Sequence, residues 1–287
     1  MYDVIIIGAG PAGISASLYA RRSNLNVLVL YNGISNVEKA QKIDNYYGFP
    51  DGVEGKKLFE YGINQAKNLG VDVIKSEVVS IENNNNLFNV KAPNKTYQAK
   101  AVIISTGNKK VDPDIKGIKK FEGKGISYCA ICDAFFYKNK TVGIIGDGEF
   151  AIEEAKILKN VTPNITIFTN GDEINTSDFE VNNKKIKEIT GDTKVNGLLF
   201  EDGSNVLLDG IFIALGEAGA LDFAKTLGII TKDNNIKVDE NMETNVKGIY
   251  ACGNNTGGLK QISKSVYEGS IAGLAVSKYI KEEFKNG

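Results

Sequence analysis

Two cysteines stand three positions apart in the segment Cys129-Ala-Ile-Cys132-Asp133. This C-x-x-C spacing is typical of a metal site or of a redox-active pair. A four-ligand zinc site needs two further soft or imidazole ligands, and the chain offers only Cys252 and no histidine. The redox interpretation is therefore favoured, and no metal is expected. At this spacing both sulfurs can lie at one helix N-terminus, where the pKa of a thiol falls toward neutrality.

Proton transfer beside this pair must use a group other than histidine. Asp133 directly follows the second cysteine and is the carboxylate placed for that role. The lack of histidine also excludes Ser-His-Asp hydrolysis, Cys-His proteolysis and His-ligated haem. The alternative interpretation of the segment is two unreactive buried thiols.

Cys252 ends the apolar run 249–252 and is expected to be a core thiol rather than a third redox partner.

The elements that must position a redox pair begin with a nucleotide fingerprint near the N-terminus. The apolar run Val4–Ile7 predicts a buried parallel strand, and residues 14–22 predict a helix. Between them lies the turn Gly8-Ala-Gly10-Pro11-Ala12-Gly13. In this context Gly8 allows the tight turn, Gly10 lets the backbone approach a pyrophosphate, and Gly13 lets the helix pack on the strand. The phosphates would lie at the helix N-terminus, whereas the alternative is a glycine-rich turn without a ligand.

A second fingerprint follows further along the chain. A strand predicted over 141–145 leads into Gly146-Asp-Gly148-Glu-Phe-Ala151 and a helix over 152–159. Two more apolar strands end in a glycine, at 101–107 and 248–253. We therefore expect an α/β fold with two Rossmann-like domains of the three-layer type, the second inserted into the first. The expected boundaries are 1–112 and 241–287 for the first domain and 113–240 for the inserted domain, which carries the cysteine pair.

Length and composition are those of an ordinary two-domain globule. The 287 residues are 42% hydrophobic and 24% charged, with 34 Lys and Arg against 35 Asp and Glu. A net charge of -1 gives no reason to expect nucleic-acid binding. Three cysteines are too few for a secreted disulfide framework. The N-terminal run lacks a basic region, and no stretch reaches the roughly 18 apolar residues of a membrane span, so we expect a cytoplasmic protein without a membrane partner.

Five motifs together resemble the low-molecular-weight thioredoxin reductases, in the same order and at similar spacing over nearly the whole chain. They are GAGPAG at 8–13, STG at 105–107, CAICD at 129–133, GDGEFA at 146–151 and ACGNNTGG at 251–258. The resemblance implies FAD/NAD(P)-type domains, with FAD bound in the first. The residues that it implies for FAD binding are Gly8, Gly10, Pro11, Ala12, Gly13, Gln41, Asn45, Thr106, Gly107, Gly253, Asn254, Gln261 and Ile262.

The same resemblance implies roles for the cysteine segment. Cys132 would face the flavin, and Cys129 would attack the disulfide of thioredoxin or a thioredoxin-like protein. Asp133 would serve as acid and base in the exchange. A homodimer is also implied.

The electron donor is where the sequence departs from the family. NADPH-using relatives carry a His-Arg-Arg…Arg cluster that binds the 2′-phosphate, whereas this chain has Ile-Thr-Ile-Phe-Thr-Asn-Gly at 165–171. The only arginines are Arg21 and Arg22, so NADPH should bind poorly. This loss resembles the ferredoxin-dependent flavin thioredoxin reductases. Asn254 also replaces the Asp that is usual in the flavin motif.

A lysine-rich segment favours a protein donor. Residues 107–140 hold eight lysines and four acids, a local charge of +4 that would steer an acidic ferredoxin. The alternative is a solvated lysine-rich surface. Two other functions stay open. One is an NAD(P)H-dependent reductase, because Gly146, Gly148 and Ala151 are retained and Asp172 or Glu173 is placed to contact a ribose; the other is a non-catalytic flavin redox sensor.

Overall fold

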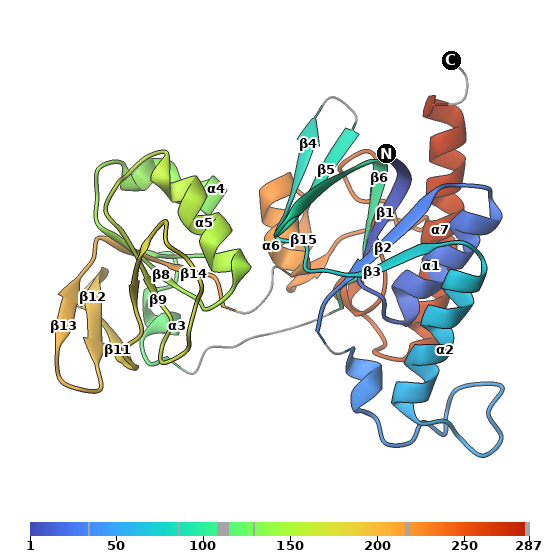
Figure 1. The fold of residues 1–287 in the computed structure, drawn as a ribbon, viewed down its shortest axis with the longest axis horizontal. Coiled ribbons are helices and arrows are strands. Elements are labelled where there is room, and N and C mark those ends of the chain that lie inside the picture. Colours follow the sequence, from blue (N-terminus) through green and yellow to red (C-terminus); the bar gives the residue numbers. More distant parts are fainter. Residues whose placement is uncertain (34, 85–86, 108–114, 129, 216–218, 285–287) are drawn as a thin grey trace. The chain divides into compact units, whose positions relative to one another are not determined.

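The chain forms two compact units, shown in the computed structural model of Figure 1. The structure describes residues 1–33, 35–84, 87–107, 115–128, 130–215 and 219–284, without the side chains of residues 131 and 132. Unit 1 comprises Met1–Lys109 and Gly219–Gly287, and unit 2 comprises Lys110–Ala218. Each unit is an α/β structure with a parallel sheet at its centre. The prediction of two Rossmann-like domains, one inserted into the other, is confirmed.

Both ends of the chain contribute to the sheet of unit 1. In the described residues its strand order is β3-β2-β1-β6-β5-β4, with β17 paired to β6. The strands are β1 (Tyr2–Ile7), β2 (Val27–Tyr31), β3 (Asp72–Lys75), β4 (Ser80–Asn84), β5 (Leu87–Ala92), β6 (Lys95–Ile104) and β17 (Ile249–Ala251). The pairs β1–β2, β1–β6 and β6–β17 are parallel. Because central parallel strands are covered on both faces, Val4–Ile7 of β1 and residues 27–30 of β2 are continuous apolar runs.

Small residues let two helices of unit 1 pack closely. These are α1 (Pro11–Arg22) and α7 (Ile262–Phe284). A Cβ atom on Gly269 would overlap the Ala12 carbonyl oxygen, and one on Gly273 would lie 2.5 Å from the Ala16 carbonyl oxygen. Figure 1 shows α7 beside α1, with α2 (Gly55–Asn68) also against α1. The C-terminal helix is therefore part of the core that the N-terminal strand begins.

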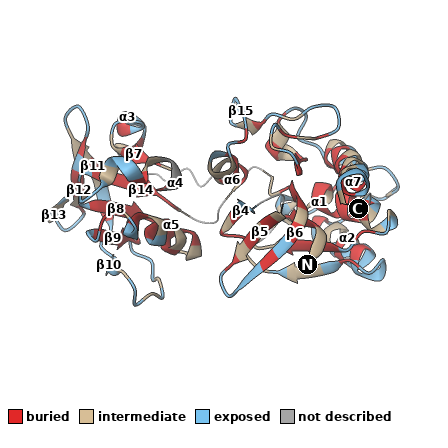
Figure 2. Cartoon of the chain, turned by 90° about the horizontal axis from the view of Figure 1, so that it is seen from above, coloured by how far each residue is buried: buried red, intermediate tan, exposed pale blue. Residues whose placement is uncertain are grey.

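Unit 2 has its own parallel sheet. The strand order is β10-β9-β8-β14-β7, and its central strands are largely buried in Figure 2. The strands are β7 (Ile126–Ser127), β8 (Val142–Ile145), β9 (Ile165–Phe168), β10 (Glu180–Asn182) and β14 (Gly210–Ile213). The predicted second strand–turn–helix is confirmed as β8 followed by α5 (Glu149–Lys159).

Shorter elements complete unit 2. They are α3 (Ile118–Phe121), α4 (Ala130–Asp133), the 3-10 helix η2 (Ala134–Tyr137) and an antiparallel sheet of β11 (Ile186–Gly191), β12 (Val195–Phe200) and β13 (Asn205–Leu207). The α3 and β11–β13 side chains share one apolar core with the parallel sheet. Helix α4 packs against α5, so the cysteine segment rests on the helix that follows the second fingerprint.

Residues 219–240 pack with unit 1, whereas the sequence placed the end of the inserted domain at 240. This stretch forms α6 (Ala220–Leu227), β15 (Thr231–Lys232) and β16 (Asn235–Ile236). Helix α6 lies against β4, and Figure 1 shows the two side by side. Its buried side chains Ala220, Phe223 and Ala224 supply the apolar face of that contact. Across the described ranges, none of the helices combines the length and apolarity that a membrane crossing requires.

Candidate active site

The glycine turn after β1 approaches the end of β6 closely. Gly8 has φ +107°, and a Cβ atom there would lie 2.5 Å from the Ser105 carbonyl oxygen. A Cβ atom on Gly13 would overlap the Gly8 carbonyl oxygen. Both positions therefore require glycine. At Gly10, by contrast, the nearest atom to such a Cβ is Ser35 Oγ at 3.7 Å, which leaves room for a ligand beside the backbone.

The N-terminus of α1 is open to an anion. Gly10 is the N-cap residue, no side chain caps the helix, and Pro11 occupies the first turn. The first turn contains no acidic residue, and Arg21 and Arg22 lie in the last turn. Free N–H groups and the helix dipole favour a phosphate at such an end. This helix therefore fits the pyrophosphate of a dinucleotide.

Ser105 fixes the end of β6 to the same turn. Its hydroxyl group donates to the carbonyl oxygens of Ile7 and Gly8, at 2.9 and 3.1 Å. Thr106 and Gly107 follow directly in the chain. The structure thus places the predicted residue Thr106 beside the glycine turn, with Gly107 next along the chain.

The turn after β17 reaches the glycine turn from the other end of the sequence. Gly253 has φ +91°, and a Cβ atom there would lie 2.9 Å from the Cβ of Ala12. Asn254 follows as the first residue of the 3-10 helix η3 (Asn254–Thr256) and is half-buried. The predicted residues Gly253 and Asn254 therefore lie beside α1.

Asn45 and Gln261 form one polar pair. The Asn45 side-chain amide donates to Gln261 Oε1 at 3.0 Å, across 216 positions of sequence. Both residues are exposed, and Ile262 directly follows as the first residue of α7. Gln41 is exposed on the segment that precedes Asn45. The pair joins two residues that the resemblance assigned to FAD.

The turn after β17 is held by two charged residues that were not predicted from the sequence. Lys264 Nζ pairs with Glu268 Oε2 at 2.8 Å and donates to the carbonyl oxygens of Gly253 and Gly257, at 2.8 and 2.6 Å. The Gly253 N–H donates to Glu268 Oε2 at 2.8 Å. The two side chains are only 16% and 12% exposed. A Lys–Glu pair at i and i+4 usually lies on a solvated helix face, so its spacing gave no signal of this role.

Replacing Lys264 by methionine should destabilise the protein, because the mostly buried Glu268 carboxylate would lose its cation. We expect the free energy of unfolding to fall by about 3 kcal/mol, measured by urea denaturation. The double variant K264M/E268Q removes the unpaired charge and should recover part of the loss. Lys278→Met is the matched control, because Lys278 and Glu282 are exposed and 3.9 Å apart on the same helix. Equal unfolding midpoints for K264M and K278M would contradict this role.

The cysteine segment lies in unit 2. Cys129 and the side chain of Cys132 are outside the described residues. Asp133, the last residue of α4, is described and half-buried. The buried Ser127, at the end of β7, donates its hydroxyl hydrogen to Asp133 Oδ2 at 2.7 Å. The structure therefore holds the predicted acid–base carboxylate in one orientation.

Two aromatic side chains stand in solvent next to this segment. Phe135 and Phe136 in η2 are 80% and 67% exposed. Tyr137 turns inward and packs edge-on against Phe212, with ring centroids 5.2 Å apart. Burial, then the charges of Asp133 and Asp209, raise the pKa of Tyr137. The exposed pair is thus an apolar surface that follows the cysteine segment within a few positions of sequence.

A buried carboxylate contacts the backbone between the cysteines. Glu154 in α5 is 7% exposed, and its Oε2 accepts a hydrogen bond from the Ala130 N–H at 2.5 Å. Glu154 was not among the residues predicted from the sequence. A signal was present, because Glu154 shares the face of α5 that Ala151, Ala155 and Leu158 bury, and a charged residue rarely occupies such a face without a partner.

Cys252 is a core thiol, as expected. It is fully buried in unit 1, and burial, then the charge of Glu268, raise the pKa of its thiol. Within the described ranges, no group of three or more His, Cys, Asp or Glu side chains is arranged to hold a metal ion.

The second fingerprint has the same close backbone approach at its first glycine as the first fingerprint, and acidic residues flank its turn. A Cβ atom on Gly146 would overlap the Ala214 carbonyl oxygen and lie 2.7 Å from the Ala151 Cβ. Glu149 lies in the first turn of α5. After β9, Asn170 Oδ1 accepts from the Ile186 N–H at 2.8 Å, so this side chain is used within the fold. The turn that would meet a nucleotide therefore carries negative rather than positive charge.

These features agree with a family match that spans most of the chain. The profile of the pyridine nucleotide-disulphide oxidoreductases matches residues 2–269. This chain belongs to that family and, within it, to the FAD-binding thioredoxin reductases.

Individual relatives cover nearly the whole chain. A thioredoxin reductase from Listeria innocua is 33% identical over 304 residues, which cover 98% of this chain and 95% of that protein. The crystal structure of the atypical thioredoxin reductase from Desulfovibrio vulgaris Hildenborough has a TM-score of 0.94 and 36% identity, and covers 99% of each chain. A ferredoxin-flavin thioredoxin reductase from Clostridium acetobutylicum has a TM-score of 0.74 and 33% identity, with 98% of this chain and 99% of that chain covered. The chain is an FAD-dependent oxidoreductase of the thioredoxin reductase type.

Proposed function

We propose that this enzyme reduces thioredoxin through the Cys129–Cys132 pair, with reduced ferredoxin as the electron donor. The observation that carries the thioredoxin assignment is the CAICD segment, with Asp133 held by Ser127, in a chain of this family. The donor assignment is supported by the acidic surroundings of the second fingerprint. It is also supported by the name of the Clostridium acetobutylicum relative.

The described residues of unit 1 fit FAD. The uncapped end of α1 suits its pyrophosphate, the open backbone at Gly10 admits it, and the Asn45–Gln261 pair offers polar contacts. When bound, FAD supplies the two-electron chemistry that opens a disulfide. The residues that we propose to hold it are Gly8, Gly10, Pro11, Ala12, Gly13, Gln41, Asn45, Thr106, Gly107, Gly253, Asn254, Gln261 and Ile262.

The protein's own groups carry out the exchange. In the proposed step the Cys129 thiolate attacks the thioredoxin disulfide, which forms a mixed disulfide and releases one thioredoxin thiolate. Asp133 gives a proton to that leaving sulfur. The Cys132 thiolate then attacks the Cys129 sulfur, which restores the enzyme disulfide and frees reduced thioredoxin. The hydrogen bond from Ser127 orients the carboxylate for this proton transfer.

We propose Phe135 and Phe136 as the contact surface for thioredoxin. Exposed adjacent aromatic side chains are typical of surfaces that bind another protein. Truncating an aromatic side chain at the centre of such an interface typically costs about 2 kcal/mol or more of binding free energy. The double variant F135A/F136A should therefore lower kcat/KM for thioredoxin by about thirtyfold, measured in a steady-state assay. Leu207→Ala is the matched control, since Leu207 is 74% exposed on β13. A loss of the same size in both variants would argue against a specific contact.

The charge around the second fingerprint disfavours NADPH. Asp147 and Glu149 flank Gly148, and Asp172 and Glu173 follow β9. Arginine is absent from the whole of 110–218 in the sequence. A 2′-phosphate would meet carboxylates without a guanidinium partner, which is unfavourable. The donor that fits this surface is one that does not place a phosphate there.

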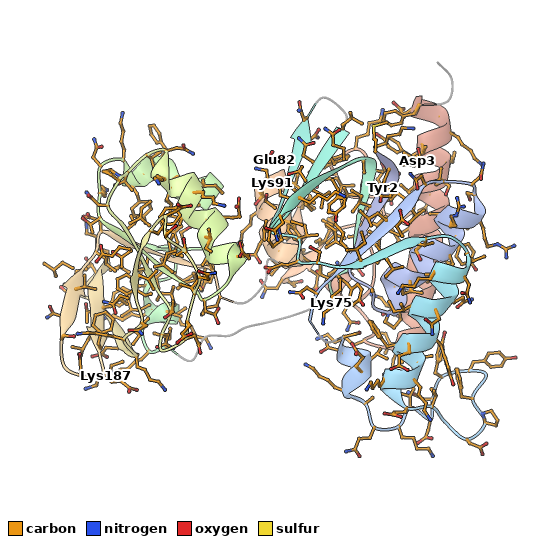
Figure 3. The ribbon with its side chains drawn as sticks, in the orientation of Figure 1. Tyr2, Asp3, Lys75, Glu82, Lys91 and Lys187 are labelled. Atoms are coloured by element: carbon orange, nitrogen blue, oxygen red, sulfur yellow. The ribbon has the colours of Figure 1, made fainter. Side chains whose placement is uncertain are left out.

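Lysines gather elsewhere on unit 2. The hydrogen bond from Lys116, at 2.7 Å, and the nearby charges of Lys187 and Lys120 lower the pKa of Glu188. These lysines are on α3, β11 and the segment before α3; Figure 3 labels Lys187. Lys109 and Lys110 of the predicted lysine-rich segment lie outside the described residues. The positive electrostatic field of these lysines would raise the association rate of an acidic ferredoxin.

Anaerobic stopped-flow mixing tests the donor. Reduced ferredoxin should bleach the flavin absorbance rapidly, with a rate that falls as ionic strength rises, because the encounter is steered by charge. NADPH at micromolar concentration should bleach it slowly. Rapid bleaching by NADPH or by NADH would instead assign a nucleotide donor, for which the intact strand–turn–helix at Gly146–Ala151 is the structural support.

We propose that the enzyme is a homodimer through the exposed face of α7. Tyr267 and Leu274 are 63% and 54% exposed and lie two helical turns apart. Tyr19 of α1 is 41% exposed, and its Cβ lies beside Gly273. A second copy would cover this apolar face. Sedimentation of the wild-type protein and of Leu274→Glu tests it: the wild type should be a dimer and the variant a monomer, whereas a monomeric wild type would refute the proposal.

A further inference from the structure

Glu154 is a carboxylate where the fold calls for an apolar side chain. Its neighbours on the buried face of α5 are Ala151, Ala155 and Leu158. Only 7% of the residue is exposed. Burial of a carboxylate is unfavourable unless hydrogen bonds compensate. A carboxylate at this buried position therefore needs a hydrogen-bond partner.

One such partner is the backbone of the cysteine segment. Glu154 Oε2 accepts from the Ala130 N–H at 2.5 Å, and Ala130 is itself fully buried. In the sequence Ala130 directly follows Cys129 and precedes Cys132 by two positions. A hydrogen bond from a backbone N–H to a carboxylate is short and strong. The Glu154 carboxylate therefore contacts the backbone of a residue that lies between the two cysteines in the sequence.

We propose that Glu154 sets the reduction potential of the Cys129–Cys132 pair; this inference rests on the proposed redox role of that pair. The disulfide takes up two electrons and two protons to give two thiols, and one thiol then loses a proton to become the reactive thiolate. A nearby carboxylate disfavours a thiolate by like-charge repulsion. The reduced pair is thereby less stable, so it is a stronger reductant. Tyr137 lies four positions after Asp133 in the chain, and the charged groups around it are Asp133, Asp209 and Lys140.

Glu154→Gln separates this electrostatic role from simple capping. The amide oxygen of glutamine can still accept from the Ala130 N–H, but the negative charge is gone. With the repulsion removed, the reduced pair should become more stable, as it is in strongly oxidising dithiol proteins. We expect the equilibrium between disulfide and dithiol to shift about tenfold toward the dithiol, which is about 30 mV for a two-electron couple.

The measurement equilibrates the holoenzyme with mixtures of dithiothreitol and its cyclic disulfide near neutral pH. In these mixtures dithiothreitol gives up two electrons and two protons as it closes its own disulfide. Acid quenching, denaturation and alkylation then count free thiols by mass. Cys252 adds one constant label, because it is a free buried thiol in unit 1. The readout needs neither ferredoxin nor thioredoxin, so it is independent of whether either one is the natural partner.

Glu153→Gln is the matched control. Glu153 is the neighbouring residue on α5, but its carboxylate pairs with Lys156 at 2.6 Å. Its midpoint should equal that of the wild type. Glu154→Met fills the same space without charge and provides a second variant should the glutamine form not fold; it should shift in the same direction. An unchanged or more negative midpoint in the Glu154 variants, or an equal shift in E153Q, would overturn the proposal.

Discussion

Cys129→Ser will reduce thioredoxin no faster than the reaction without enzyme, yet it will still bind FAD. Disulfide exchange needs one thiolate to attack the partner and a second to resolve the mixed disulfide, and a serine at position 129 cannot supply the attacking thiolate. The predicted FAD-binding residues lie in unit 1, whereas residue 129 belongs to unit 2. The variant should therefore lose thioredoxin reduction but keep FAD binding. Turnover with thioredoxin and the flavin absorbance of the purified variant measure them.

Cys252→Ala is the control for this variant. Cys252 is fully buried in unit 1, whereas residue 129 belongs to unit 2. Its replacement should leave turnover near the wild-type value. Thioredoxin turnover by C129S, or loss of flavin from it, would show that the cysteine has been assigned the wrong role.

Asp133→Asn should lower thioredoxin turnover by about 10²- to 10⁴-fold, the usual contribution of a positioned acid or base. The amide keeps the shape of the side chain but cannot give or take the proton of the leaving sulfur. Because the loss concerns proton transfer, the pH dependence of kcat should also flatten. Steady-state rates across a pH series measure both effects.

Two further variants test whether the effect of D133N is specific to the oriented Asp133 carboxylate. Ser127→Ala removes the hydrogen bond that orients Asp133 and should cost about tenfold, since the carboxylate remains. Asp209→Asn is the control: Asp209 also lies near Tyr137, but its carboxylate accepts from the Thr141 N–H at the edge of β8. A D133N rate within twofold of the wild type would remove Asp133 from the mechanism.

The parts of the fold that follow from local sequence were predictable. β1 and β8 are continuous apolar runs with a glycine turn directly after them, and this order of features specifies a strand, a turn and a helix. The helix after the second turn begins at Glu149, earlier than the predicted 152. An acidic side chain suits the first turn of a helix, so the apolar pattern alone placed its start too late.

The parts that depend on distant contacts were not predictable. The place of residues 219–240 follows from the packing of α6 on β4, which no local pattern encodes. Family resemblance assigned Asn45 and Gln261 to FAD separately, but it did not predict their hydrogen bond to each other, because 216 positions separate them. Lys264 and Glu268 have the spacing of a solvated pair and became mostly buried only because the turn after β17 folds over them. For Glu154 the signal was its position on an apolar helix face.

An anaerobic titration with dithionite tests most directly whether bound FAD and the cysteine pair form one redox unit. The wild type should take up about four electrons per chain, two in the flavin and two in the disulfide. Cys129→Ser should take up about two, all of them in the flavin. A colourless protein that does not bind added FAD, or an equal electron uptake by the wild type and C129S, would contradict the account.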